Sequence, residues 1–109
     1  DNTAVGQQAL FNSTGNANLA VGSQAATLLT TGNDNAALGS GALFNTTTGS
    51  TNTAVGNSSL STNVTGSANT ALGYNAEVAT SGLTNATAIG ANSQVAASNS
   101  LVLGSINGV

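Results

Sequence analysis

Residues 52–56 read Asn-Thr-Ala-Val-Gly, and close copies of this five-residue pattern recur along the chain. Every copy ends in a glycine, and these glycines are Gly6, Gly22, Gly39, Gly56, Gly73, Gly90 and Gly104. Successive glycines are 16, 17, 17, 17, 17 and 14 residues apart. The chain is therefore a tandem repeat, and the period of that repeat decides its fold.

A period of this length is too short for repeats built from pairs of helices, which need about 33 residues or more. Gly, Asn, Thr and Val also disfavour helix interiors. Each period can hold two short strands and two turns, with the glycine turning at positive φ and a Thr-Gly pair such as 48–49 forming the second corner. The sequence thus predicts an all-β fold, a parallel β-roll or β-solenoid whose coils stack about 4.8 Å apart.

Stacking in register would bring equivalent residues into columns. The bulkier apolar column is predicted to form the core, and it comprises Val5, Val21, Leu38, Val55, Leu72, Ile89 and Leu103. The alternate strand position is almost always alanine, which indicates a close contact on the other strand face. Because a thin coil of small residues buries little apolar area for each ordered residue, we expect chains to associate along this alanine face.

The asparagines that begin the pattern form another column, namely Asn18, Asn35, Asn52 and Asn69. Stacked asparagines can pair their side-chain amides from coil to coil, as amide ladders do. Turn propensity alone is the alternative explanation of this column.

The composition excludes most chemistry. The 109 residues include no Lys, Arg, His or Cys, so the usual zinc and haem ligands and the usual nucleophile–base pairs are missing. Without cations the chain is not expected to bind nucleic acid or anionic membranes. The only carboxylates are Asp1, Asp34 and Glu77, which are far apart in sequence and are predicted to be solvated surface charges. We expect no catalytic residues, no cofactor and no metal, and hence no enzyme.

Three aromatic side chains interrupt the repeat, Phe11, Phe44 and Tyr74. An exposed aromatic ring can stack on a sugar, so these are the candidate ligand contacts. The alternative is that they fill gaps between associated chains.

The last third of the chain, from Thr87-Ala-Ile-Gly90 to Leu101-Val-Leu-Gly104, resembles the 14-residue head repeat of YadA-like trimeric autotransporter adhesins. The longer units, such as residues 52–60, are similar to repeats of tail-fibre-domain proteins of bacteria and phages. This resemblance implies a left-handed parallel β-roll, a homotrimeric fibre, a place outside the cell or on a phage particle, and a glycan or protein receptor. The 17-residue unit departs from the adhesin repeat by three residues.

The chain divides into residues 1–85, with five repeats of 16–17 residues, and residues 86–109, with the shorter repeat and an exit segment. We expect one continuous domain, cut from a longer fibre protein. It would be a structural and adhesive segment of a bacterial adhesin or of a phage or injection-machine tail fibre, without direct membrane insertion. The alternative is an ice- or surface-binding solenoid that uses a threonine column, formed by Thr14, Thr31, Thr48 and Thr65.

Overall fold

The computed structural model describes residues 1–104, and the last five residues of the predicted exit segment lie outside them. The described residues contain nine short strands and no helix. The strands are β1 (Thr3–Val5), β2 (Leu19–Val21), β3 (Ala36–Leu38), β4 (Thr53–Val55), β5 (Thr70–Leu72), β6 (Glu77–Val78), β7 (Thr87–Ile89), β8 (Gln94–Val95) and β9 (Leu101–Leu103). The predicted all-β fold is confirmed.

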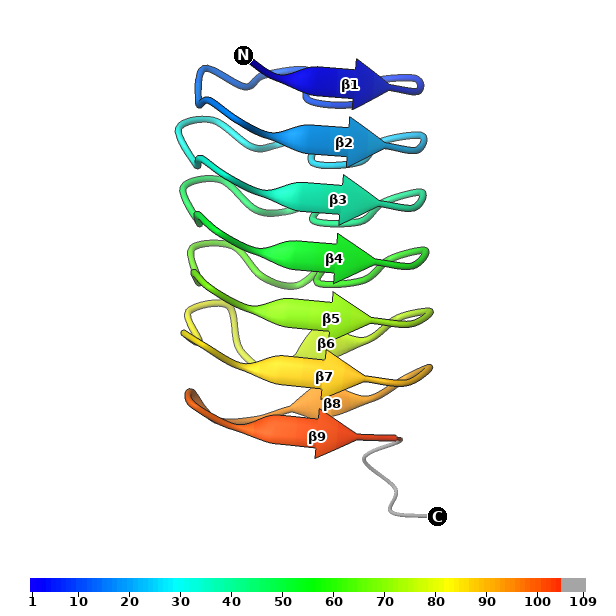
Figure 1. Cartoon of the computed structure of the whole chain (residues 1–109), viewed down its shortest axis with the longest axis vertical. Coiled ribbons are helices and arrows are strands. Elements are labelled where there is room, and N and C mark those ends of the chain that lie inside the picture. The colour runs from blue at the N-terminus through cyan, green and yellow to red at the C-terminus, as the bar shows by residue number, and fades with distance from the viewer. Residues whose placement is uncertain (105–109) are drawn as a thin grey trace.

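Seven of the strands form one parallel sheet in the order β1-β2-β3-β4-β5-β7-β9. Equivalent repeat positions are in register, for example Ala20 with Ala37 and Val21 with Leu38. Each strand belongs to one coil, and the coils stack along the longest dimension of a body that measures 39 × 21 × 16 Å (Figure 1). The predicted parallel β-solenoid is therefore confirmed.

The prediction that the bulkier apolar column forms the core is wrong, because that column lies on the outer face of the sheet and the alanine column lies on the inner face. The bulkier column points outward: Val5, Leu72 and Leu103 are 58%, 48% and 70% exposed. The alanine column points inward and is fully buried in the inner coils, at Ala20, Ala37, Ala54, Ala71 and Ala88. Association of chains along the alanine face is consequently ruled out, since that face lies inside each coil.

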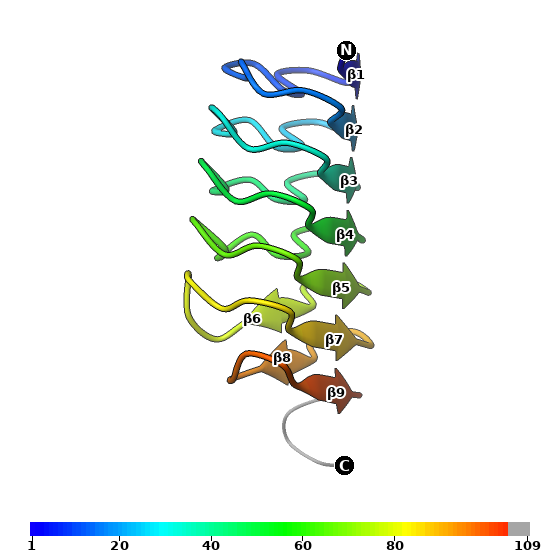
Figure 2. The same ribbon diagram turned by 60° about the vertical axis from the view of Figure 1, so that its left-hand side comes forward.

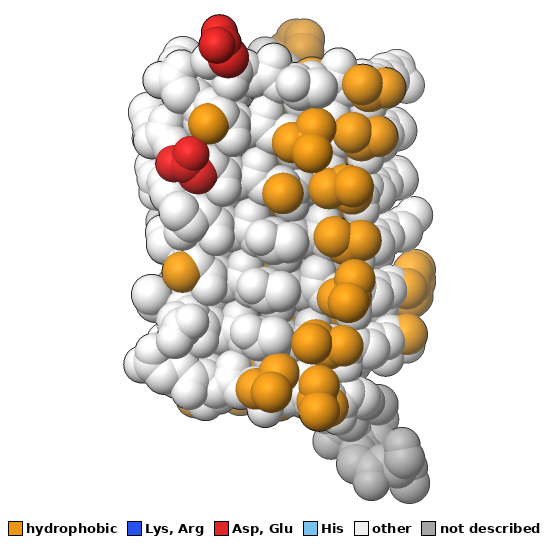
Figure 3. Space-filling model, in the orientation of Figure 1, with side chains coloured by type: hydrophobic (Ala, Val, Ile, Leu, Met, Phe, Trp, Pro, Cys, Tyr) orange, Lys and Arg blue, Asp and Glu red, His pale blue; other side chains and the backbone are white. Residues whose placement is uncertain are grey.

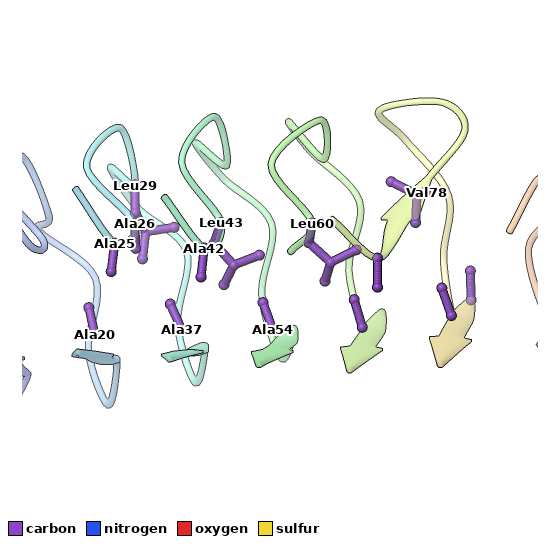
Figure 4. Packing of buried hydrophobic residues seen from close by; sticks show 14 of the residues in the cluster. Ala20, Ala25, Ala26, Leu29, Ala37, Ala42, Leu43, Ala54, Leu60 and Val78 are labelled. Atoms are coloured by element: carbon purple, nitrogen blue, oxygen red, sulfur yellow. The ribbon is translucent and has the colours of Figure 1, made fainter. Parts of the chain in front are cut away.

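The opposite wall of each coil explains why alanine is the inner residue. In the long coils this wall contributes large buried side chains, among them Leu29, Leu43 and Leu60, which face the strand alanines (Figure 4). A coil with leucines on one wall has room only for small side chains on the other, since protein interiors are close-packed. The alanine column is the small half of a large–small core.

The second wall changes its structure near the C-terminal end. In the first four coils it consists of turns, and the residue four places after the glycine, as in Leu43 and Leu60, has φ near +50°. In the last two coils it becomes a second parallel sheet, β6 with β8, opposite the main sheet (Figure 2). The prediction of two strands in each period is therefore right for these last two coils and wrong for the others.

The glycines that end the main strands turn at positive φ, as predicted, with values from +85° to +138°. They are also packed against one another along the stack. A Cβ on Gly22 would lie 2.5 Å from the carbonyl oxygen of Gly39, and a Cβ on Gly39 would lie 2.4 Å from that of Gly56. No other residue fits there without shifting the next coil.

The predicted asparagine ladder is confirmed. The side-chain Nδ2 of Asn35 donates to the Oδ1 of Asn18 at 3.1 Å and to the carbonyl oxygen of Gly49 at 2.9 Å. The Oδ1 of Asn35 accepts in turn from the backbone N–H of Asn52 at 2.9 Å. All four predicted asparagines are at most 2% exposed, so each amide satisfies buried backbone groups of neighbouring coils.

Candidate functional site: an aliphatic stripe and a polar groove

The outward Val, Leu and Ile side chains form a continuous apolar band, which we call the aliphatic stripe. It consists of Val5, Val21, Leu38, Val55, Leu72, Ile89 and Leu103, each of them exposed or only partly buried. The stripe follows the main sheet from one end to the other (Figure 3). It is widened by a leucine in the neighbouring outward column at the second strand, Leu19, and at the last strand, Leu101.

An uncovered face is unusual for a parallel sheet, because such sheets normally have both faces packed. Here the inner face packs on the coil interior, and the outer face carries the stripe with nothing against it among the described residues. The arrangement presents a straight apolar surface that is suited to contact with another surface.

A second feature lies beyond the glycine turn, on the other side of that turn from the stripe. It is a groove of about 320 Å³ formed across neighbouring coils, which we call the polar groove. Its walls include Gln24, Gly41, Phe44, Asn45, Asn57 and Ser61.

The groove exists because one side chain is missing from a column. The residue two places after the strand glycine has φ between +52° and +67° in the coils from Gln8 to Asn92. This position holds Gln24 in one coil and Ser58 two coils further on, but Gly41 between them. A Cβ on Gly41 would meet only the Ser58 Oγ, at 3.7 Å, so the space beside it is open.

Two hydrogen bonds fix polar groups of the groove wall. The Asn45 Nδ2 donates to the Ser61 carbonyl oxygen at 2.7 Å, and the Ser58 Oγ donates to the Asn57 Oδ1 at 2.9 Å. The Ser61 side chain donates to Glu77, which lies in the following coil. No charged residue lines the groove.

Glu77 is not the solvated surface charge that the sequence predicted. It is 5% exposed, and its carboxylate accepts hydrogen bonds from the backbone N–H and the hydroxyl of both Ser61 and Thr62. These four donors compensate for the loss of water around the buried charge. Asp1 and Asp34 are exposed, as predicted.

The three candidate aromatic residues differ in their surroundings. Phe11 and Tyr74 are 70% and 59% exposed, whereas Phe44 is partly buried and forms a wall of the polar groove. Sequence reasoning missed the groove residues Gly41, Gln24 and Asn57. The signal that could have found them is Gly41, the only glycine among residues 1–66 that lies outside the two repeating glycine columns.

The threonine column is exposed at all four positions. The Thr14 hydroxyl donates to the Thr30 carbonyl oxygen at 3.0 Å, so part of its hydrogen-bonding capacity is used within the chain. The preceding column is irregular, with Ser13, Val64 and two threonines.

Residues 1–104 contain no group of three or more His, Cys, Asp or Glu side chains that could hold a metal ion. They also contain no helix that is long and apolar enough to cross a membrane. Comparisons with protein-family models, with curated proteins and with solved structures found no match.

Proposed function

We propose that the chain is a structural and adhesive segment of an extracellular homotrimeric fibre, built from a left-handed coil. The observation that carries this proposal is the aliphatic stripe, which runs the length of the described sheet and lies uncovered. Rotation about an axis parallel to the stack would bring the same stripe of each copy to a common centre, as closed cyclic symmetry requires.

The energetics favour this association. Transfer of the exposed part of each stripe side chain out of water contributes about 1 kcal/mol, at about 25 cal/mol per Å². Seven such positions in each chain sum to several kcal/mol, before the cost of association. The acidic side chains visible in Figure 3 lie away from the stripe, so like charges do not oppose contact there.

The remaining parts of the proposal rest on the composition and on the resemblance of the repeats. A segment without catalytic groups suits a scaffold that displays a receptor-binding surface, on a bacterial adhesin or on a tail fibre. The receptor would be a cell-surface glycan or protein.

Native mass in solution tests the association. The chain has a mass of 10.3 kDa, and light scattering on a size-exclusion column is expected to give three times that value. Leu38→Asp places a charge in the middle of the stripe and is expected to yield a folded monomer. Thr48→Asp places the same charge on an exposed corner outside the stripe and should leave the trimer intact. A monomeric wild-type protein that retains β-structure would contradict the proposal.

A second candidate function, ice or surface binding, is favoured by the exposed threonine column. Threonines 14, 31, 48 and 65 form one column, and the column before it is irregular, with Ser13 and Val64 among its members. Thermal hysteresis of the monomeric Leu38→Asp variant distinguishes the two functions. Ice shaping by this variant, lost when Thr31→Val is added to it, would favour ice binding over the fibre.

A further inference from the structure

We infer that the polar groove binds a neutral saccharide, with Phe44 as the stacking wall and the surrounding amides as hydrogen-bonding groups. This inference rests on the adhesive part of the proposed function and names the chemistry of its receptor. It does not depend on the number of chains in the fibre.

The first argument is the aromatic wall. Phe44 lies between two small side chains of its own column, Thr27 in the preceding coil and Ser61 in the following one. The ring is partly buried and borders the groove, so its position is set by the coil and part of its surface remains accessible. Pyranose rings carry an apolar C–H face, which packs on an aromatic ring.

The second argument is the set of unused polar atoms. Hydrogen bonds within the chain use the Nδ2 of Asn45 and the Oδ1 of Asn57. The Asn45 Oδ1 and the Asn57 Nδ2 make no hydrogen bond within the described chain, which leaves one acceptor and one donor beside the ring. Sugar hydroxyls both donate and accept, so this mixed set of amide atoms suits them.

The third argument concerns charge. The sequence has no Lys, Arg or His, and the groove is lined by uncharged side chains. The hydroxyl of Ser61, a wall residue, donates to the buried carboxylate of Glu77. A sulfated, phosphorylated or sialylated sugar would find no counter-charge here and would be repelled by that carboxylate. The groove is therefore matched to neutral hexose and N-acetylhexosamine residues.

Gly41 is the residue that keeps the groove open. Its backbone φ of +67° is shared by glutamine and asparagine in other coils, at +60° for Gln24 and +58° for Asn92. A glutamine at position 41 is thus compatible with the coil, and its side chain would occupy the space beside Phe44. Gly41→Gln closes the groove without removing any groove residue that contacts the sugar.

The test measures binding of the intact protein to immobilised probes. The neutral probes are maltohexaose, chitotetraose and lacto-N-tetraose, and the acidic probes are 3′-sialyllactose and a heparin tetrasaccharide. We expect at least one neutral probe to bind and neither acidic probe to do so. Binding should fall about tenfold or more in Phe44→Ala and Gly41→Gln, and roughly threefold to tenfold in Asn57→Ala.

Matched variants control for general effects on the fold. Phe11→Ala removes a ring from the same column outside the groove, and Asn92→Gln places a glutamine in the same column as position 41. Both should bind the neutral probe as the wild type does. Asn57 lies on the surface, and its side chain makes a single hydrogen bond within the described residues, so Asn57→Ala stays informative even where Gly41→Gln fails to fold.

Three outcomes would overturn the inference: no probe binds, only acidic probes bind, or binding survives in Phe44→Ala and Asn57→Ala. Native mass is recorded for every sample. A monomer that binds a neutral probe would support the saccharide site and contradict the trimer. A trimer that binds no probe would support the trimer and contradict the saccharide site.

Discussion

The first four coils and the last two share one sheet but build the opposite wall differently. In the first four coils the wall is made of turns, and the fourth residue after the glycine points into the core at positive φ, as Leu60 does. In the last two coils the fourth residue is polar, Glu77 or Gln94, and the fifth is a buried valine in a strand. A one-residue shift of the inward side chain accompanies the change from turn to strand.

This difference shows how side-chain shape selects the backbone. A valine is stiff and disfavours positive φ, whereas it fits well in a strand. A leucine can take the left-handed conformation at a cost of about 1–2 kcal/mol, which its burial offsets. Valine at the fifth position therefore favours a strand, whereas leucine or alanine at the fourth position is compatible with the turn, as Leu60 and Ala26 show.

The largest expected effect comes from truncating the core residues of the two walls. Leu60→Ala should lower the free energy of unfolding by about 2–5 kcal/mol, since Leu60 is fully buried and its neighbours cannot fill the cavity. Val95→Ala removes two carbons rather than three and should cost less. Urea unfolding at equal chain concentration measures both, and equal losses would contradict the assignment of the main core to the leucine wall.

The second-largest effect is expected from the asparagine ladder. The ladder also distinguishes the two regions, because it ends where Ala86 replaces the asparagine. Asn35→Ala leaves the Gly49 carbonyl oxygen and the Asn52 N–H without their side-chain partners. Each buried unpaired group costs about 1–3 kcal/mol, so we expect a loss of roughly 2–4 kcal/mol. Asn12→Ala removes a single 3.3 Å bond from an exposed residue and serves as the control.

Glu77 lies at the junction where the opposite wall changes from turns, in the first four coils, to strands, in the last two. Glu77→Gln would turn an amide donor toward the hydroxyl and N–H donors of Ser61 and Thr62. We expect a loss of about 1–3 kcal/mol in the free energy of unfolding. Asp34→Asn, at an exposed site, is the matched control, and equal behaviour of the two variants would show that the buried carboxylate contributes nothing to the junction.

The smallest effect concerns the corner residue that precedes the asparagine ladder position, which has positive φ in every coil, as in Asp34 and Thr51. The last two coils place asparagine there, Asn85 and Asn99, while a long coil has Thr51 at φ +59°. A β-branched residue is strained in this region and asparagine tolerates it best. Thr51→Asn should therefore raise the free energy of unfolding by about 0.5–1 kcal/mol, measured by urea unfolding; a loss would mean that the Thr51 hydroxyl bond to the Ser50 carbonyl matters more.

The repeat period made much of the fold predictable. Seven glycines at nearly constant spacing predicted parallel coils, and the recurring asparagine predicted the amide ladder. Both features depend on equivalent residues meeting in adjacent coils, which any in-register stack guarantees.

The inward and outward faces were harder to predict, because both strand columns are apolar. Size alone favoured Val21 and Leu38 as core residues, yet the interior already holds Leu43 and Leu60 from the opposite wall. Which wall carries the bulk depends on packing across the coil, and the strand pattern by itself does not contain that information.

The groove and the junction were hidden for a related reason. The partners of Glu77 lie one coil earlier, and Phe44 borders residues from three coils. Sequence reasoning treated Glu77 as a lone acid, although a carboxylate in the column of Leu43 and Leu60 is a break in the pattern that indicates a local change of wall.

The direction of the hydrogen bonds has a mechanical consequence. Strand pairs and the amide ladder both connect one coil to the next, so these bonds lie along the long dimension of the molecule. Under a stretching force along that dimension, the bonds within one coil boundary share the load, while successive boundaries bear it in series. Such a rod fails at its weakest boundary. The amide ladder reinforces the boundaries between Asn2 and Ala86, whereas the boundary between β7 and β9 lies beyond it.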